Sequence, residues 1–344
     1  MKKKLLITLF VLIMTAVLSV AVLAGCTDDD SDGNGAKVIN IVVPDGSPAI
    51  ALAKLINDNA APDGYTVNYS VVAGATQIST AIANKTADIA IAPTNIGATI
   101  YNKTGAVKLY ATVVQGALYM VGKESLAGDT VQEKLASLKG QTVFNIGQGG
   151  TPDLTFKYIL DHYGIAYQAT DVEDESYVAL RYVTDGSELL PMLKQGTAKY
   201  GILGEPAVSR ANTNTGTSTV FDIQELWKDV TGAQTAGFPQ ASVFVTTELL
   251  NGEHAALLSW LSAGLKDNAA WAKSNPATVS EVLASKGSTS LNGLTSGMIE
   301  ACNLDYVSAV DAKQAVNTYL SALYGFAANT VGGKMPDDAF YYAG

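Results

Sequence analysis

The segment Asn145–Leu154, NIGQGGTPDL, has the residue types of a loop that binds an anion at the start of a helix. Glycines expose backbone N–H groups, and such loops hold phosphate in many nucleotide-binding proteins. However, no lysine follows Gly150, and Pro152 stands where the dinucleotide-binding pattern has its third glycine. Asp153 falls in the first turn of the expected helix, where it would repel a highly charged anion. The segment therefore argues against nucleotide binding.

A second element of the same type occurs earlier in the chain. Gly-Ser-Pro at 46–48 matches Gly-Thr-Pro at 150–152, an offset of 104 residues. Serine and threonine are favoured N-cap residues, and proline is favoured at the first helical position. Each element therefore predicts a helix that begins directly after a strand, with Ser47 or Thr151 as its N-cap. Two interpretations stay open: a plain helix cap, or a helix start at which Ser47, Gly150 and Thr151 contact a ligand.

The chain repeats a second pattern in the same order. TADIAI at 86–91 matches TAKYGI at 197–202, an offset of 111 residues, and a short insertion accounts for the difference from the first offset. Two matches on the same types of element predict two lobes of similar construction.

Strand and helix patterns alternate through both halves of this repeat. The expected strands are 37–46, 65–73, 87–94, 141–150, 177–184 and 198–206, and helical patterns follow most of them. This alternation predicts an α/β fold with largely parallel sheets. Pro191 either kinks its helix or lies in the first turn. A β-rich run at 107–124, interrupted at Gly116, is a candidate crossing between the lobes.

The loops after the matched strands supply further candidate ligand-binding residues. Thr94 and Asn95 follow one strand, and Glu205 follows its counterpart. In open α/β sheets, ligands bind outside the carboxyl ends of the strands. Glu205 either pairs with a ligand amine or ring N–H, or is a solvated loop acid or an interlobe salt-bridge partner. Gln115, beside Gly116, either reaches a ligand or satisfies the hinge backbone.

Composition excludes several classes of function. The net charge is −10, and the chain has two arginines, Arg181 and Arg210, so we expect no nucleic-acid partner. The two histidines, His162 and His254, have no Cys or His at metal-binding spacing, so we expect no metal site and surface positions for both. No nucleophile elbow or other catalytic motif is present, and we expect neither catalytic residues nor a cofactor.

The N-terminus has the pattern of an export signal. Three lysines precede an uncharged run that ends in Leu23-Ala24-Gly25-Cys26. This ending resembles the lipobox of bacterial lipoproteins, which implies cleavage before Cys26 and lipid modification of its thiol. The alternative is an uncleaved transmembrane helix. Residues 1–25 are then a signal peptide and residues 26–36 an acidic, flexible tether. Cys302 would remain as a core thiol.

These features together resemble the solute-binding proteins of bacterial ABC importers, in particular those that bind taurine, nitrate, alkanesulfonates and thiamine-pyrimidine precursors. The resemblance covers most of the chain from Lys37 onward. It is carried by DGSPAIALAKLI, GATQISTAIANKTADIAIAP, GGTPDLTFKYILDHYGI, GSELLPMLKQGTAKYGILGEP, FPQASVFVTTELL and VGGKMPDDAFYY.

The resemblance implies a two-lobed type II periplasmic-binding-protein fold with a ligand cleft between the lobes. Lobe 1 would comprise residues 36–117 and 247–344, and lobe 2 residues 118–246. The implied protein is a monomer on the extracytoplasmic face of the cell membrane, anchored through Cys26, which delivers a small molecule to an ABC permease. A sensory receptor of the same fold is the alternative, and an enzyme that makes a cofactor precursor is a weaker one.

The resemblance also selects ligand-contacting positions at the strand ends and helix starts that face the cleft. They are Ser47, Thr94, Gln115, Gly150, Thr151 and Glu205, with Asn95 beside them. The scarcity of arginine and the presence of Asp153 depart from the sulfonate and nitrate pattern, which argues against a strong oxyanion. The 16 tyrosines favour stacking on a heterocyclic or amide-bearing ligand.

Overall fold

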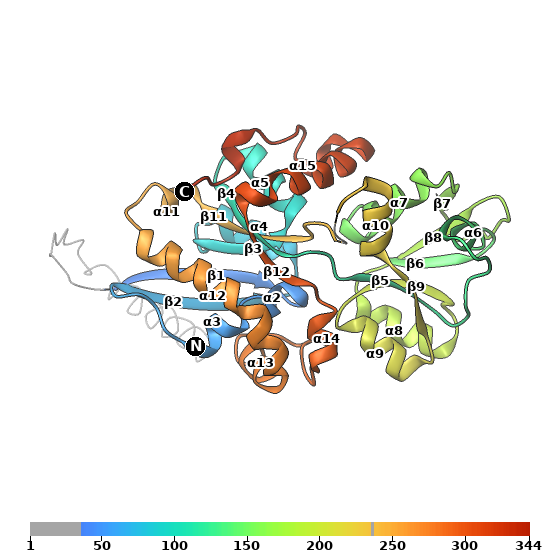
Figure 1. The fold of residues 1–344 in the computed structure, drawn as a ribbon, viewed down its shortest axis with the longest axis horizontal. Coiled ribbons are helices and arrows are strands. Elements are labelled where there is room, and N and C mark those ends of the chain that lie inside the picture. Colours follow the sequence, from blue (N-terminus) through green and yellow to red (C-terminus); the bar gives the residue numbers. More distant parts are fainter. Residues whose placement is uncertain (1–35, 235–236) are drawn as a thin grey trace, which may run out of the picture. The chain divides into compact units, whose positions relative to one another are not determined.

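The computed structural model describes residues 36–234 and 237–344. The expected signal peptide and Cys26, with nearly all of the tether, lie outside the described residues. Within them the chain forms two six-stranded sheets, each accompanied by helices (Figure 1). We call the part of the chain built on the first sheet lobe 1 and the part built on the second sheet lobe 2. Both belong to one compact unit, Lys37–Gly344.

The first sheet has the strand order β12-β4-β11-β3-β1-β2. Its strands are β1 (Lys37–Pro44), β2 (Tyr65–Val72), β3 (Ile89–Pro93), β4 (Val107–Val114), β11 (Ala241–Thr246) and β12 (Leu304–Ser308). β1 pairs in parallel with β2 and β3, whereas β11 is antiparallel to β3 and β4. β3 is a buried apolar run over its first four residues, as expected for a parallel strand with both faces covered.

The second sheet has the order β10-β5-β9-β6-β8-β7. Its strands are β5 (Leu118–Gly122), β6 (Thr142–Ile146), β7 (Tyr167–Ala169), β8 (Val178–Val183), β9 (Tyr200–Gly204) and β10 (Ser218–Asp222). β6 pairs in parallel with β8 and β9, and β5 is antiparallel to β9.

The two sheets contain the same four-strand arrangement. The order β2-β1-β3-β11 in lobe 1 corresponds to β8-β6-β9-β5 in lobe 2, with the same parallel and antiparallel pairs. The two Gly-Ser/Thr-Pro elements follow β1 and β6, and the two TAD/TAK elements lead into β3 and β9. The internal repeat predicted from the sequence is therefore confirmed.

Helices cover both sheets. They are α2 (Ser47–Ile50), α3 (Ala53–Asp58), α4 (Ala75–Ala83), α5 (Thr94–Thr104), α6 (Val131–Ala136), α7 (Thr151–His162), α8 (Gly186–Gln195), α9 (Ala207–Thr215), α10 (Ile223–Thr231), α11 (Thr247–Leu250), α12 (Ala255–Ser274), α13 (Pro276–Ala284), α14 (Ser296–Glu300) and α15 (Ala309–Phe326), with short 3-10 turns η1 (Ala328–Val331) and η2 (Asp338–Phe340). None of the described helices is long and apolar enough to cross a membrane.

Local signals explain where several helices begin and end. The Asp185 and Asp222 side chains accept hydrogen bonds from the first backbone N–H groups of α8 and α10, and both helices end at a glycine with positive φ. Pro191 lies inside α8 rather than in its first turn. The helix predicted to begin at Ser47 is divided into α2 and α3 by a turn at Ala51 and Leu52.

Two segments cross between the sheets. The first joins β4 to β5 through Gln115–Ala117, as the interruption at Gly116 predicted. The second precedes β11, so residues 241–246 belong to the first sheet. The predicted boundary, which assigns residues up to 246 to lobe 2, is wrong for this strand. The crossings are bonded to each other, because Gln240 N–H donates to the Val114 carbonyl and Phe238 N–H donates to the Gln115 carbonyl.

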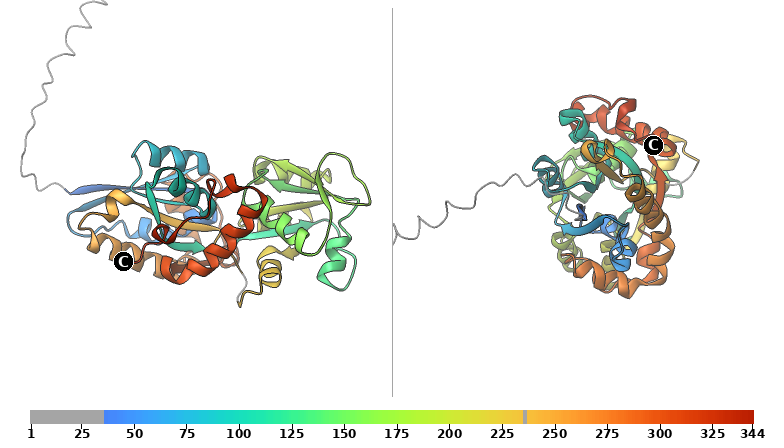
Figure 2. Two further views of the ribbon diagram at one scale, coloured as in Figure 1. Left: turned by 90° about the horizontal axis from the view of Figure 1, so that it is seen from above. Right: turned by 90° about the vertical axis from the view of Figure 1, so that its left-hand side faces the viewer.

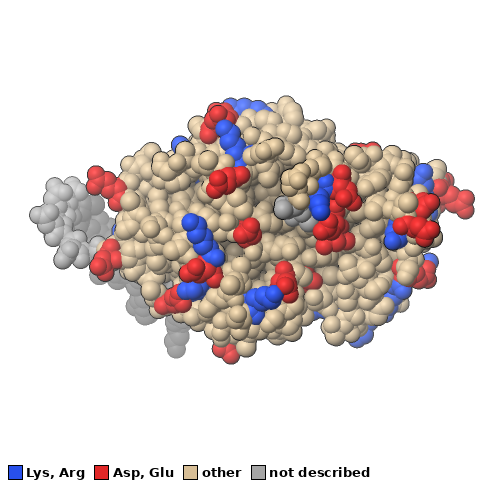
Figure 3. Space-filling model, viewed as in Figure 1, with Lys and Arg blue, Asp and Glu red and all other residues tan. Residues whose placement is uncertain are grey.

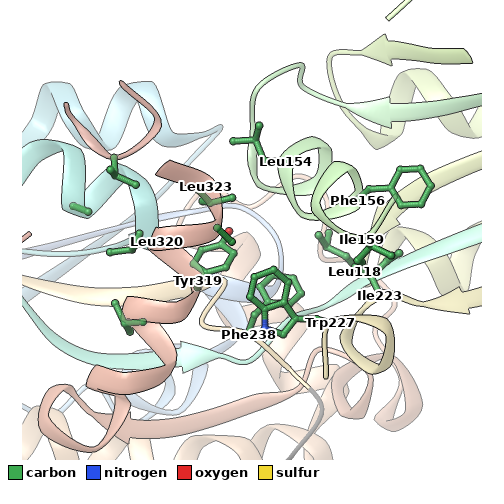
Figure 4. Packing of buried hydrophobic residues seen from close by; sticks show 14 of the residues in the cluster. Leu118, Leu154, Phe156, Ile159, Ile223, Trp227, Phe238, Tyr319, Leu320 and Leu323 are labelled. Atoms are coloured by element: carbon green, nitrogen blue, oxygen red, sulfur yellow. The ribbon is translucent and has the colours of Figure 1, made fainter. Parts of the chain in front are cut away.

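One hydrophobic cluster joins the two lobes beside the crossings. It contains Trp227 of α10, Phe238 of the second crossing and Tyr319 of α15, together with the buried face of α7 (Figure 4). α15 packs against β4 and α5 in lobe 1 and against α7 in lobe 2, and Figures 1 and 2 show its course. The C-terminal helix therefore bridges the lobes.

Candidate functional site

The predicted site residues lie where strands of both lobes end. Ser47 follows β1, Thr94 and Asn95 follow β3, and Gln115 follows β4. In lobe 2, Gly150 and Thr151 follow β6, and Glu205 follows β9. Their order along the sheets matches the internal repeat. The side chains of Ser47, Thr94, Asn95, Thr151 and Glu205 are all buried.

Ser47 and Glu205 meet across the lobes. The N-cap of α2 is Gly46, so Ser47 is the first helical residue and Pro48 the second. The prediction that Ser47 caps this helix is therefore wrong. Its hydroxyl instead donates to the backbone carbonyl of Glu205 at 2.9 Å. The side chain that could have capped α2 links lobe 1 to lobe 2.

Thr151 shows the same departure. Gly150 is the N-cap of α7 and Pro152 the second helical residue, so the N-cap prediction is wrong here too. Thr151 Oγ1 accepts a hydrogen bond from the Tyr319 hydroxyl at 3.1 Å. Burial raises the pKa of Tyr319 to about 12, so the phenol keeps its proton and donates at neutral pH. The second helix start is therefore linked to α15 of lobe 1.

Aromatic side chains pack around Tyr319. Its ring is stacked on Phe238, with centroids 5.4 Å apart, and meets Trp227 edge-on at 5.6 Å (Figure 4). Trp227 in turn contacts the ring of Tyr158. Offset and edge-to-face contacts of this kind stabilise a buried cluster beyond the area they bury. No sequence signal marked Tyr319 as a contact of the α7 start.

The Glu205 carboxylate is held within its own lobe. It accepts hydrogen bonds from the hydroxyl and the backbone N–H of Ser209, at 2.9 and 3.3 Å. Burial raises the pKa of this carboxyl group. Glu205 is neither a solvated loop acid nor an interlobe salt-bridge partner, because it is only 6% exposed and forms no salt bridge among the described residues.

Arg210 of α9 makes a second contact between the lobes. Its guanidinium donates to the backbone carbonyls of Ser290 and Asn292 in lobe 1, at 2.5 and 2.6 Å. Tyr119 of β5 likewise donates to the Ala301 carbonyl at 2.9 Å. Together with the Ser47 bond, these contacts hold the lobes together on the side of α9.

Thr94 and Gln115 already have protein partners. Thr94 Oγ1 donates to the Pro239 carbonyl at 2.6 Å and lies 2.7 Å from Ser242 Oγ. Gln115 Nε2 donates to Thr112 Oγ1 at 2.8 Å and to the carbonyl of Asp305 at 3.1 Å. These bonds match the alternative in which Gln115 satisfies polar groups near the hinge.

A cavity of about 530 Å³ lies between the starts of α5 and α7. Its walls come from both lobes and include Asn95 and Thr330 of lobe 1 and Gly149, Lys157 and Tyr167 of lobe 2. The remaining lining residues are Ile96, Thr99, Leu154, Phe326, Ala327 and Asn329. Of the seven predicted residues only Asn95 lines it.

Asp153 does not present a free charge to this cavity. Its completely buried carboxylate accepts from Gly149 N–H at 2.7 Å, Lys157 Nζ at 2.9 Å and the Tyr182 hydroxyl at 3.0 Å. The prediction that Asp153 repels an anion assumes an unpaired first-turn acid, whereas the carboxylate has three partners. The lysine four residues later could have been recognised as its partner from helical spacing.

The described residues offer no metal centre. Between residues 36–234 and 237–344, no three His, Cys, Asp or Glu side chains are grouped to hold a metal ion. His162 is exposed, whereas His254 is partly buried and bonded to the Tyr65 hydroxyl. Cys302 is completely buried, as predicted, and burial raises the pKa of its thiol to about 12. Charges of both signs are scattered over the face in Figure 3, without a basic patch among the described residues drawn there.

No protein-family model matches the chain, and no curated protein is similar to it in sequence. Solved structures share its fold. An ABC transporter from Parabacteroides distasonis has a TM-score of 0.73 and 25% identity, over 89% of this chain and 99% of that one. The periplasmic aliphatic sulphonate-binding protein SsuA from Escherichia coli has a TM-score of 0.65 and 15% identity, over 90% and 92%.

A ligand-binding component of an ABC-type import system from Staphylococcus aureus has a TM-score of 0.59 and 11% identity, over 89% of this chain and 96% of that one. The chain therefore has the two-lobed α/β fold of the type II periplasmic-binding proteins, as predicted. The proteins that share this fold include binding components of ABC import systems.

Proposed function

We propose that this chain is a solute-binding protein that captures a small organic molecule between its lobes and delivers it to an ABC permease. The observation that carries the proposal is the cavity whose walls come from both lobes, at the starts of α5 and α7, in a chain with this fold. A sulfonate, a pyrimidine or thiamine precursor, or another heterocycle is the expected class of ligand. Of the proposed contact residues Ser47, Thr94, Asn95, Gln115, Gly150, Thr151 and Glu205, Asn95 lines this cavity. The other six would contact a ligand only in an arrangement in which the lobes have moved apart.

Capture would use a hinge motion about the two crossing segments. Because these segments are bonded to each other, the lobes would move as two bodies about one short ribbon. In the arrangement seen here, Ser47, Tyr119 and Arg210 each donate a hydrogen bond to a backbone carbonyl of the other lobe. Opening would break those bonds. A ligand shifts the equilibrium between the open and closed arrangements toward the closed one only if it binds the closed arrangement more tightly.

The pattern of the N-terminal sequence supports a proposal for the location of the protein. We propose cleavage before Cys26, lipid anchoring through that residue, and a monomer on the extracytoplasmic face of the membrane. The proposed binding role requires no catalytic residue and no cofactor.

Ligand-dependent stabilisation of the purified full-length protein tests this function. A solute that binds only the folded protein at 100 times its Kd adds about 2.7 kcal/mol to the unfolding free energy. Sulfonates, nitrate, pyrimidines, flavins and amino acids should include at least one compound that raises the melting temperature. A screen in which none does so would contradict the proposal.

A pair of matched variants locates the binding site. Asn329 is exposed and lines the cavity, so Asn329→Trp should obstruct it and abolish the ligand-induced shift. Gln314 is exposed on α15 and does not line this cavity, so Gln314→Trp should keep the shift. Equal shifts in both variants would place binding elsewhere.

A further inference from the structure

A second cavity, of about 580 Å³, lies within lobe 1 between α4 and α5. We call it the lobe 1 cavity. Its walls come from these two helices and from the chain before β3, before β4 and after β11. It therefore lies at the start of β3, whereas the predicted site residue Thr94 follows the end of that strand. Thr99 is the one wall residue that it shares with the cavity between the lobes. Because every wall residue belongs to lobe 1, the lobe 1 cavity does not depend on how the lobes are arranged.

The internal repeat shows which side chain leaves this space open. The offset of 111 residues aligns α4 with α8, and it places Ser79 of α4 at the position of Leu190 of α8. Leu190 packs against a hydrophobic cluster that joins α8 to α9 and includes Leu193 and Val208. The Ser79 side chain is much smaller, and its hydroxyl donates back to the carbonyl of Ala75 at 3.1 Å. Lobe 2 therefore has a leucine at the position where lobe 1 has a serine in the cavity wall.

The floor of the lobe 1 cavity is apolar. Ile82 and Ala87 are buried in the core of lobe 1, and Ile100 and Ala106 are partly buried against the same core. An aliphatic group placed on this floor would lose its contact with water, and this transfer is the main source of affinity for such a group. A cavity of several hundred Å³ with apolar walls and a few polar groups is the ordinary form of a small-molecule site. The lobe 1 cavity therefore suits an aliphatic chain.

The rim of the lobe 1 cavity carries four charged side chains, and three of them have partners. Lys85 is paired with Glu248 at 3.3 Å, and the Asp88 carboxylate accepts a hydrogen bond from the backbone N–H of Asn40 at 2.8 Å. Lys103 is exposed in the last turn of α5 and forms no ion pair among the described residues. An unpaired ammonium beside an apolar floor is complementary to a ligand with a negatively charged head group.

From these observations we propose that the lobe 1 cavity is a second binding site, and that its ligand is an amphipathic monoanion. The aliphatic chain of the ligand lies against Ile82 and Ile100, and its carboxylate or sulfonate pairs with Lys103. A medium-chain alkanoate is the simplest molecule of this kind. This site is separate from the one in which the chain is proposed to capture a solute between its lobes, so it goes beyond the proposed function.

Calorimetric titration of the full-length protein with matched amphiphiles tests the site. The probes are octanoate and octanesulfonate, the uncharged octan-1-ol, and butanoate, whose chain is shorter. Butanoate should bind about a hundredfold more weakly than octanoate, because it buries fewer methylene groups. Octan-1-ol should bind about three- to fivefold more weakly than octanoate, because an ion pair with an exposed lysine contributes modestly. Binding of either anion supports the site, and their relative affinity identifies the preferred head group. Absence of binding by both anions would overturn the site, and equal affinity for octanoate and octan-1-ol would overturn the pairing with Lys103.

A substitution taken from lobe 2 tests the location of the site. Ser79→Leu gives α4 the side chain that α8 has at this position, and it should abolish octanoate binding because it fills the cavity. Thr80→Leu is the matched control, because Thr80 is exposed on α4 and does not line the lobe 1 cavity. This variant should keep the affinity of the unmodified protein. Full octanoate binding by Ser79→Leu would overturn the location.

Two lysines test the contact with the head group. Lys103 and Lys194 are both exposed in the last turn of a helix, and neither forms an ion pair among the described residues. Each interacts with its helix dipole in the same way, but Lys194 lies on α8 and does not line the cavity. Lys103→Gln should weaken octanoate binding about three- to fivefold and leave octan-1-ol binding unchanged, whereas Lys194→Gln should change neither. An equal loss in both variants would contradict the pairing with Lys103.

The variant Asn329→Trp separates this site from solute capture between the lobes. It should leave octanoate binding unchanged, because Asn329 lines the cavity between the lobes and not the lobe 1 cavity. Loss of octanoate binding in Asn329→Trp, with full binding in Ser79→Leu, would place the anion between the lobes. That result would overturn the second site and support solute capture. If Ser79→Leu does not fold, the probe series on the unmodified protein and the pair of lysine variants decide the question.

Discussion

The helix starts after β1 and β6 carry the same sequence element but are built differently. α2 has four residues and begins after Gly46, whose φ of 112° and ψ of −158° suit glycine alone. α7 has 12 residues and begins after Gly150, whose φ of −86° and ψ of 177° any residue can adopt. The two copies of the element therefore have similar residues but different backbone conformations at the glycine. In lobe 1 the glycine is needed for its backbone conformation, whereas in lobe 2 it is not.

The hydroxyls of the two elements share a function that local rules did not predict. Ser47 donates to a backbone carbonyl of lobe 2, and Thr151 accepts from a side chain of lobe 1. Neither caps its own helix. Each element therefore forms a hydrogen bond with the other lobe. The partner is a backbone carbonyl for Ser47 and a tyrosine hydroxyl for Thr151.

The largest effect should come from removing the aromatic partner of Thr151. Tyr319 is completely buried, so Tyr319→Ala should lower the free energy of unfolding by about 3–5 kcal/mol. Tyr319→Phe removes only the hydrogen bond and should cost about 1 kcal/mol. Urea unfolding of the two variants and of Ser47→Ala measures these costs. If Tyr319→Ala cost no more than Ser47→Ala, the two links would be equivalent and the contrast would fail.

The two glycines should differ by a smaller amount. Gly46→Ala forces an L-residue into a glycine-only region and should cost about 1–3 kcal/mol. Gly150→Ala needs only a small adjustment, because its Cβ would lie 3.1 Å from the Gly147 carbonyl oxygen, and should cost less than about 1 kcal/mol. Thermal and urea unfolding of both proteins checks the order. A larger cost at Gly150 would reverse the interpretation of the element.

The smallest effect is a dependence on pH at the side chain of Glu205, the residue whose backbone carbonyl accepts from Ser47. Burial raises the pKa of the Glu205 carboxyl above its usual 4.5, so the folded state binds its proton more tightly than the unfolded state. Its contribution to the unfolding free energy therefore falls as pH rises through 4.5 and above. Glu205→Gln lacks this slope and should gain stability relative to the unmodified protein between about pH 4 and pH 7.

An exposed carboxylate provides the opposite sign for this experiment. Hydrogen bonds from the backbone N–H groups of Thr130 and Asp129 lower the pKa of Glu133, so Glu133→Gln should lose relative stability over the same rise in pH. Urea midpoints at the two pH values are the measurement. Parallel behaviour of the two variants would show that burial of Glu205 does not govern its titration.

The sequence predicted β3 and β9 well because each is an apolar run that ends in proline or glycine, and it predicted β2 from its alternating pattern. The repeat offsets added the correspondence between β1 and β6 and between β3 and β9. The sequence predicted the location of the candidate site in general terms, since carboxyl ends of parallel strands share one edge. The assignment of β11 failed for a physical reason. A strand that follows a crossing can join either sheet, and no local pattern says which.

The contacts of the site were less predictable because they depend on residues distant in sequence. Ser47 and Glu205 are separated by 158 positions, and Tyr319 lies 168 positions after Thr151. Capping preferences reflect hydrogen bonds within one helical turn. Here each hydroxyl instead forms a hydrogen bond with a residue of the other lobe. Asp153 and Lys157 are the exception, since their spacing alone was sufficient to pair them.

The position of β11 has a consequence for the order in which the protein is completed during synthesis. β11 lies between β3 and β4 in the first sheet, yet it follows every strand of the second sheet along the chain. Lobe 2 draws its six strands from the continuous stretch 118–222. Since a chain emerges from its N-terminus, lobe 2 has all its strands before the centre of lobe 1 can be filled. The lobe that begins first is thus the one finished last.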